Sequence, residues 1–231
     1  MINTAPIIVF DLDGTLAETA PDLIGTLNVL LAREGLPPVP VSAARQIVGA
    51  GARALIERGF GYHGARLAPE RIDPLVQEFL AHYEQHIAEK THLFPGALEA
   101  LTRFEDAGFQ LAVCTNKPER LSRILLGALG VAERFAAICG RDTFAMSKPD
   151  GRALLLTIEA GRGDPARALM VGDSRTDIDT ARNARVPVVA VDFGYTDAPV
   201  AELSPDRVIS HYDELWGAVE ALMSVEAVAR S

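Results

Sequence analysis

The chain has 231 residues, of which 48% are hydrophobic, and its 31 acidic and 22 basic residues give a formal net charge of −9. This length and composition are typical of a folded domain with a smaller insert, and not of a disordered protein. Binding to nucleic acid is disfavoured, because a phosphate backbone needs a cationic face and the Lys and Arg residues are scattered. An acidic protein binds a small anion only where a metal ion or well-positioned hydrogen-bond donors make the local electrostatic potential positive. We therefore expect a cation at any anion-binding site of this protein.

The sequence shows no sign of export, membrane binding or zinc binding. Residues 1–5 lack Lys and Arg, and the apolar run that follows ends at Asp11, too early for a signal peptide or a membrane span. Cys114 and Cys139 lack C-x-x-C spacing and clustered histidines. We therefore expect a cytoplasmic protein with buried, reduced thiols.

Residues 1–93 combine one strand with a long helical segment. Residues 7–10 form an apolar run typical of a buried strand, whereas apolar residues in residues 17–93 recur at helical spacing without a strand pattern. We therefore predict a helical cap domain at residues 17–93, inserted into a core domain that comprises residues 1–16 and 94–231. Residues 17–93 are called the insert below.

From residue 94 onward, strand and helix patterns alternate. Strands are predicted at residues 110–114, 136–139, 168–171, 188–191 and 208–209. Helices are predicted at residues 97–107, 118–129, 151–160, 176–184 and 215–222. Such alternation builds a doubly wound parallel sheet. The predicted fold class is therefore α/β, with a Rossmann-like parallel sheet as the core and an inserted all-α helical cap.

Two acids follow the first predicted strand. Residues 9–16 read V-F-D-L-D-G-T-L, which places Asp11 and Asp13 two residues apart at the strand end, directly before Gly14. Alternate side chains of a strand point to opposite faces, but a glycine where the strand ends lets the chain turn both acids toward one crevice. Open α/β sheets bind ligands at this edge.

Polar residues also follow the later strands. Thr115 and Asn116 precede a helix N-terminus, where backbone N–H groups favour an anion, and Lys148 precedes another helix. Asp173 and Asp177 follow the strand predicted at residues 168–171. Two carboxylates about 4 Å apart repel by roughly 4 kcal/mol at an effective dielectric constant of about 20. A phosphate ester would add to this repulsion, so the set predicts a phosphate site with a divalent cation, and its oxygen ligands favour Mg²⁺.

The pattern resembles the haloacid dehalogenase superfamily of phosphohydrolases from residue 7 to about residue 191. Its four motifs are matched in order by Asp11-Leu-Asp13-Gly-Thr15, Thr115, Lys148 and Gly172-Asp173-Ser-Arg-Thr-Asp177. Within the superfamily the chain is most similar to the phosphoglycolate phosphatases, through Val48-Gly49-Ala-Gly51-Ala-Arg53, Val113-Cys-Thr-Asn-Lys-Pro118 and Val171-Gly-Asp-Ser-Arg-Thr-Asp177. It departs at Gly151, where that family usually carries Pro; we expect a small backbone adjustment there and unchanged chemistry.

The resemblance implies roles for these residues. Asp11 would attack phosphorus and become an aspartyl phosphate, while Asp13 would protonate the departing alkoxide and then activate water. Thr115, Asn116 and Lys148 would stabilise the transferring phosphoryl group. The implied ligands of Mg²⁺ are Asp11, Asp13 through its backbone carbonyl, Asp173 and Asp177. Asp177 would act through a metal-bound water or by orienting Lys148; the alternative is an ordinary acid of a helix first turn.

The insert is implied to be a lid that excludes water and recognises the leaving group. Gly49 and Arg53 are its candidate substrate-binding residues, because a guanidinium can grip a carboxylate with two hydrogen bonds. For Arg53 a solvent-exposed, non-functional position is the competing interpretation. Lys148 likewise has a surface alternative, and Thr115-Asn116 has a helix-capping alternative that is compatible with phosphate binding.

The expected activity is hydrolysis of a small phosphate monoester, with 2-phosphoglycolate as the leading substrate. A sugar phosphate, pyrophosphate or a β-phosphoglucomutase-like phosphotransfer remain alternatives. Dehalogenases lack an acid at the position of Asp13, and phosphonate hydrolases need a lid lysine that residues 17–89 do not contain. A non-enzymatic receiver domain is a distant alternative, since its paired acids precede its phospho-acceptor. We expect a monomer or homodimer that binds a small phosphorylated substrate.

Overall fold

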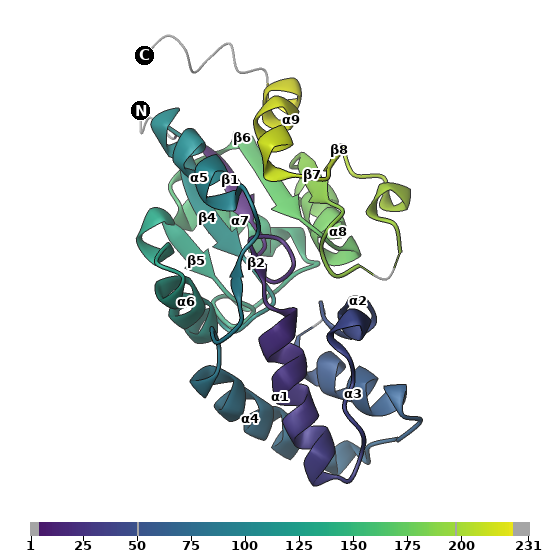
Figure 1. Cartoon of the computed structure of the whole chain (residues 1–231). Helices are drawn as coiled ribbons and strands as arrows, with labels where there is room; N and C mark the ends of the chain where they lie inside the picture. Colours follow the sequence, from purple (N-terminus) through teal and green to yellow (C-terminus); the bar gives the residue numbers. More distant parts are fainter. Residues whose placement is uncertain (1–4, 50, 197, 224–231) are drawn as a thin grey trace.

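A parallel sheet flanked by helices forms the upper part of the molecule, and a group of helices lies below it (Figure 1). The structure is a computed structural model that describes residues 5–49, 51–196 and 198–223. Within these ranges, no helix combines the length and the apolar character needed to cross a membrane.

The sheet has six parallel strands in the order β5-β4-β1-β6-β7-β8. Their bounds are β1 (Ala5–Phe10), β4 (Gln110–Cys114), β5 (Ala137–Cys139), β6 (Gly163–Gly172), β7 (Val188–Val191) and β8 (Arg207–Ile209). Strands are added outward from β1 in both directions, which is the doubly wound arrangement. The predicted α/β class with a Rossmann-like core is confirmed.

Two apolar layers cover the sheet. Ile8 and Phe10 of β1 face one layer, and Ile7 and Val9 face the other, all with no exposed surface. The first layer is covered by α5 (Ala97–Asp106), α6 (Glu119–Ala128) and α9 (Leu215–Leu222), and the second by α7 (Gly151–Ala160) and α8 (Arg175–Ala184). Because both faces are buried, β1 reads as a continuous apolar run.

Gly151, the departure from the family pattern, begins α7. A Cβ atom there would lie 2.5 Å from the backbone nitrogen of Ala184, the last residue of α8. Glycine therefore lets the start of α7 approach the end of α8 closely.

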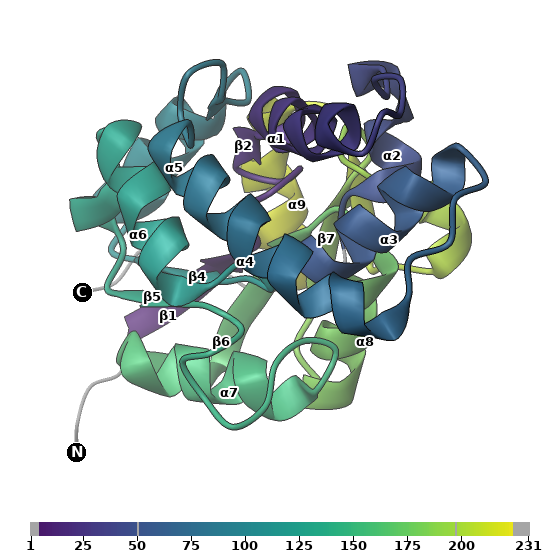
Figure 2. The ribbon, with the colours of Figure 1, turned by 90° about the horizontal axis from the view of Figure 1, so that it is seen from below.

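The insert contains four α-helices among its described residues, α1 (Ala20–Arg33), α2 (Ala44–Ile47), α3 (Ala52–Tyr62) and α4 (Pro69–Gln85). Seen from below, they lie in front of the edge of the sheet (Figure 2). The two chain segments that join insert and core pair as a short antiparallel ladder of β2 (Ala17–Glu18) and β3 (His92–Leu93). Only helices were predicted here, because strands of two residues are too short to show a period.

Short 3₁₀ turns complete the described elements: η1 (Val41–Ala43), η2 (Ala132–Arg134), η3 (Val200–Leu203) and η4 (Tyr212–Glu214). Most predicted boundaries differ from the observed ones by no more than two residues. The largest difference is β6, which begins at Gly163 because Gly163 pairs with Ala5 before a shift in register leads to the pairing of Ile7 with Ala168.

Candidate active site

The predicted polar residues meet where β1, β4 and β6 end, on the side of the sheet that faces the insert. Asp11 follows β1, Thr115 follows β4 and Asp173 follows β6. They line a pocket together with residues of the insert such as Leu55 and Phe79. Parallel strands bring their carboxyl ends to one edge, so three distant parts of the sequence converge there.

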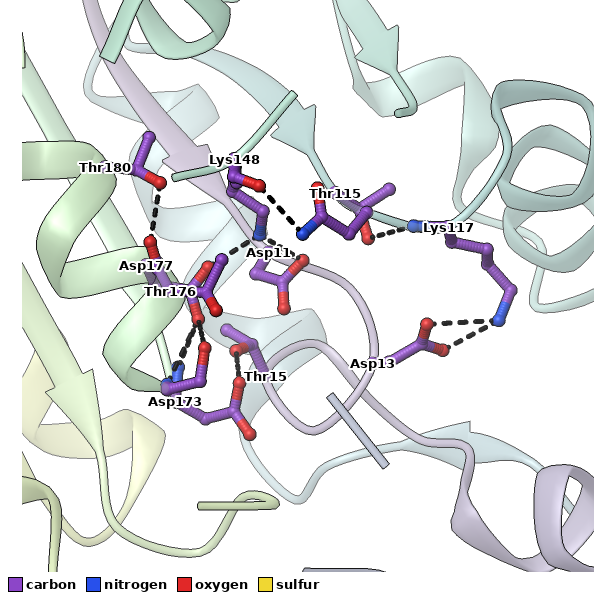
Figure 3. A network of polar contacts seen from close by, with 12 residues as sticks. Asp11, Asp13, Thr15, Thr115, Lys117, Lys148, Asp173, Thr176, Asp177 and Thr180 are labelled. Atoms are coloured by element: carbon purple, nitrogen blue, oxygen red, sulfur yellow. Dashed lines mark hydrogen bonds and ion pairs between the residues drawn. The ribbon is translucent and has the colours of Figure 1, made fainter. Parts of the chain in front are cut away.

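Lys148 connects two of the acids (Figure 3). Its Nζ lies 2.7 Å from Asp11 Oδ1 and 2.6 Å from Asp177 Oδ1, and its side chain is only 2% exposed. Burial by itself disfavours the ammonium ion, but the two carboxylates outweigh this effect and raise the pKa of Lys148. The lysine is therefore charged at neutral pH and is not a surface residue.

Both carboxylate oxygens of Asp177 accept hydrogen bonds. Oδ1 contacts Lys148, while Oδ2 accepts hydrogen bonds from the Asp173 and Ser174 backbone nitrogens at 3.2 and 3.1 Å and from Ser174 Oγ at 2.6 Å. The exchange with Ser174 forms a capping box at the start of α8. Asp177 is thus both a helix-start residue and the group that fixes Lys148.

Asp173 completes a group of three buried carboxylates. One oxygen each of Asp11, Asp173 and Asp177 lies within 4.8 Å of the others. Asp173 accepts hydrogen bonds from Thr15 Oγ1 at 3.2 Å and from the Tyr195 backbone nitrogen at 2.6 Å. This acid cluster, Asp11, Asp173 and Asp177, holds more negative charge than Lys148 alone neutralises.

The electrostatics of the acid cluster favour a bound cation. Burial raises the pKa of Asp11 to about 6, against the opposing effect of Lys148. Burial, followed by the charges of Asp177 and Asp11, also raises the pKa of Asp173 well above its ordinary value. A divalent ion would remove this penalty by compensating the ionised forms.

The donor set fits a hard metal ion. Asp11, Asp173 and Asp177 each offer a carboxylate oxygen, and these oxygens lie close enough together for one ion to contact all three. Carboxylate oxygens suit cations such as Mg²⁺. Gly14, with φ of +84°, makes the close packing feasible, since a Cβ atom there would lie 2.5 Å from Asp173 Oδ2.

Thr115 and Asn116 are positioned beside this group. The Thr115 hydroxyl accepts a hydrogen bond from the Lys117 backbone nitrogen at 3.2 Å, which is a capping-type contact near the start of α6. Asn116 Nδ2 donates to the Lys148 carbonyl at 3.1 Å, and its Oδ1 is buried without a partner. Both residues line the pocket next to Asp11.

Asp13 lines the same pocket but points away from the acid cluster, toward Lys117 (Figure 3). Lys117 Nζ donates to its two oxygens at 2.8 and 3.1 Å, and also to the Tyr83 hydroxyl of α4 at 3.0 Å. Lys117 is a site residue that was not predicted from the sequence. A cation beside a helix N-terminus is electrostatically unfavourable, so a lysine at this position signals an anionic partner.

The predicted insert residues have different positions. Gly49 lines the pocket. Arg53, on α3, is half exposed, and its guanidinium pairs with Asp73 of α4. Arg53 is absent from the residues that line the pocket, so the structure does not bring it together with the acids. Residue 50 of the same motif lies outside the described residues.

Comparisons with known proteins agree with this architecture. A family model described as haloacid dehalogenase-like hydrolase matches residues 8–191, which include the acids and Lys148. A phosphoglycolate phosphatase of Mesorhizobium japonicum is 54% identical over 91% of this chain and 92% of its own length. An N-acetylmuramic acid 6-phosphate phosphatase of Pseudomonas aeruginosa is 38% identical over 90% of this chain and 92% of its own.

The fold has solved counterparts as well. The crystal structure of a predicted phosphoglycolate phosphatase from Haemophilus somnus is 28% identical, with a TM-score of 0.84 over 92% of this chain and 97% of that one. The sequence motifs, the sheet topology and the relatives all point to the same family. The chain belongs to the haloacid dehalogenase-like hydrolase family.

Proposed function

We propose that this protein is a Mg²⁺-dependent phosphatase that hydrolyses a small phosphate monoester, with 2-phosphoglycolate as substrate and glycolate and phosphate as products. The observation that carries the proposal is the position of Asp11, a buried carboxylate that lies 2.7 Å from the Lys148 ammonium and beside Asp173 and Asp177. The relatives named phosphoglycolate phosphatase, 54% and 47% identical over most of the chain, support this substrate.

In the first step, an Asp11 oxygen forms a bond to phosphorus while the bond from phosphorus to the ester oxygen breaks. Asp13 donates its proton to the departing alkoxide. In the second step, water attacks phosphorus, Asp13 accepts a proton from that water, and the bond from Asp11 to phosphorus breaks. Lys148, Thr115 and Asn116 stabilise the charge on the phosphoryl oxygens.

The acid cluster and the backbone carbonyl of Asp13 are the proposed holders of Mg²⁺. The ion would neutralise negative charge on the phosphoryl group and the acids. Asp177 differs from the other two acids, because four donors already occupy its oxygens. We assign it chiefly to positioning Lys148.

The pocket favours a small leaving group. It has a volume of about 60 Å³ for water-sized molecules, which corresponds to roughly five waters. Residues 17–93 would act as a cap over it, and most side chains that they contribute are apolar, among them Leu23, Leu55 and Phe79. We propose that the enzyme acts in the cytoplasm as a monomer or homodimer.

A sugar phosphate is the second candidate substrate, because one relative is named N-acetylmuramic acid 6-phosphate phosphatase. Sugar hydroxyls need hydrogen-bond partners, which the apolar side chains of the insert do not supply. A sugar ring would also require the insert to move outward.

The test is steady-state hydrolysis by the purified full-length protein with Mg²⁺, using 2-phosphoglycolate, glucose phosphates and pyrophosphate. The proposal expects the highest kcat/KM for 2-phosphoglycolate, with glycolate and phosphate formed in equal amounts. A sugar phosphate with the highest kcat/KM would replace the substrate assignment, and the absence of turnover on all of them would refute the proposal.

A further inference from the structure

Lys117 is a buried cation that the mechanism above leaves without a function. Its side chain is 4% exposed, and it contacts Asp13 of the core and Tyr83 of the insert. Its Nζ also lies 4.5 Å from the centre of the Tyr83 ring. Burying an ammonium ion is costly unless it has partners, and Asp13 and Tyr83 are the partners that keep Lys117 charged beside the pocket.

Lys117 and Lys148 are the two positively charged side chains among the described residues that line the pocket. Lys148 is already engaged by Asp11 and Asp177, on the phosphoryl side. Lys117 lies apart from that group, next to Asp13 (Figure 3). A second anionic group of a substrate would therefore find its cation at Lys117.

Tyr83 supplies a second donor at the same place. Its hydroxyl oxygen accepts a hydrogen bond from Lys117, so its own proton is free to bind another acceptor. Burial raises the pKa of Tyr83 to about 12, so the hydroxyl keeps this proton. An ammonium and a hydroxyl side by side suit the two oxygens of a carboxylate.

The distance from Lys117 to the chemistry matches a short substrate. Asp13 must come within hydrogen-bond reach, about 2.6–3.2 Å, of the ester oxygen that it protonates. Lys117 Nζ lies 2.8 Å from Asp13 Oδ1, and Asp13 would reach the ester oxygen by turning its side chain, so Lys117 lies within the reach of one aspartate side chain from the leaving group. In 2-phosphoglycolate the carboxylate is bonded to the carbon that carries the ester oxygen, which brings it to this position.

We propose that Lys117, assisted by the Tyr83 hydroxyl, binds the carboxylate of the leaving group and thereby selects phosphate esters of 2-hydroxy acids. This inference rests on the proposed phosphatase function and deepens it. On binding, the substrate carboxylate takes the place of the Asp13 carboxylate beside Lys117, and Asp13 turns to the ester oxygen. Lys117 thus takes the role that the sequence analysis gave to Arg53.

The test compares Lys117→Met with the parent protein on 2-phosphoglycolate and on ethyl phosphate, which lacks the carboxylate. The variant removes the charge and keeps an unbranched side chain that is one heavy atom shorter. We expect kcat/KM for 2-phosphoglycolate to fall roughly 100-fold, and that for ethyl phosphate to change less than about 5-fold. Lys90→Met is the matched control, because Lys90 is exposed and absent from the pocket, and it should leave both values unchanged.

Two inhibitors that are not hydrolysed provide a readout independent of turnover. 3-Phosphonopropionate keeps the carboxylate, whereas propylphosphonate lacks it. The parent protein should bind the first at least 10-fold more tightly, and Lys117→Met should bind both equally. If Lys117→Met folds poorly, Lys117→Gln, which keeps a donor without the charge, serves in its place, and Tyr83→Phe should reduce the preference in part.

Lys117→Met could instead lose kcat/KM equally on 2-phosphoglycolate and ethyl phosphate and still prefer 3-phosphonopropionate. That result would show that Lys117 only holds Asp13, and it would overturn the inference. Loss of the preference in Arg53→Met but not in Lys117→Met would overturn it as well. A parent protein that does not hydrolyse 2-phosphoglycolate would instead refute the proposed function.

Discussion

The core side and the insert side of the pocket differ in the kind of residue that they contribute. The core side presents the acid cluster with Lys148, and burial raises the pKa values of Asp11 and Asp173 there. The insert side presents mainly apolar side chains, with Tyr83 reaching Lys117. In the function proposed above, the core side carries out the phosphoryl transfer, whereas the contacts near the insert choose the leaving group.

The largest effect should come from Asp11→Asn on the core side. An amide cannot serve as the attacking nucleophile, so kcat should fall by at least about 10⁴-fold on every phosphate ester. Asp106→Asn, an exposed acid at the end of α5, is the matched control and should retain full activity. A decrease in kcat that is confined to 2-phosphoglycolate would contradict the assignment of phosphoryl transfer to the core side.

Lys148→Met should have the next largest effect. It removes the cation between Asp11 and Asp177 and leaves both acids without this partner. We expect kcat to fall roughly 10³-fold for 2-phosphoglycolate and for ethyl phosphate alike, measured at saturating Mg²⁺. Unlike Lys117→Met, this variant should not alter the ratio between the two substrates; a changed ratio would contradict the assignment.

Metal binding should stabilise the fold in a pH-dependent way. The pKa of Asp11 is raised from 3.8 to about 6 in the folded protein, and that of Asp173 is raised too. The folded state therefore holds protons more tightly than the unfolded chain, so the metal-free protein loses stability as the pH rises through this range.

Mg²⁺ binds the ionised acids and removes this loss, so the increase in Tm on adding Mg²⁺ should be larger at about pH 7 than at about pH 5. Scanning calorimetry with Mg²⁺ or with a chelator measures the difference. A larger increase at the lower pH would contradict the proposed electrostatics of the acid cluster.

The smallest effect is expected for Arg53→Ala. The guanidinium is exposed and paired with Asp73, outside the pocket lining. The ratio of kcat/KM values for 2-phosphoglycolate and ethyl phosphate should change less than about 3-fold. A selective loss for 2-phosphoglycolate would restore Arg53 as the carboxylate-binding residue and would require the insert to change position on binding.

The sequence located the core side of the site well for a physical reason. Asp11, Thr115 and Asp173 each follow a strand that reads as apolar, and in a parallel sheet such positions share one edge whatever the details of packing. Gly14 also marked the sharp turn after the first strand. These features are local in sequence, so a single chain is enough to read them.

The insert side was predicted less well. Helical periodicity shows which face of α4 is apolar, but not where that helix packs against the core. The contact of Tyr83 with Lys117 spans 34 residues in sequence and depends on that packing. For the same reason, the glycine-rich segment before α3 drew attention to Arg53, whose side chain points elsewhere.

The central claim is that Asp11 carries the phosphoryl group during turnover. Asp13→Asn, mixed with an aryl phosphate whose leaving group needs no proton, should complete the first step and stall before the second. Borohydride reduction converts an aspartyl phosphate to homoserine, which mass spectrometry locates in the chain. The proposed mechanism leads to homoserine at position 11, whereas an unmodified Asp11, or homoserine at another acid, would refute it.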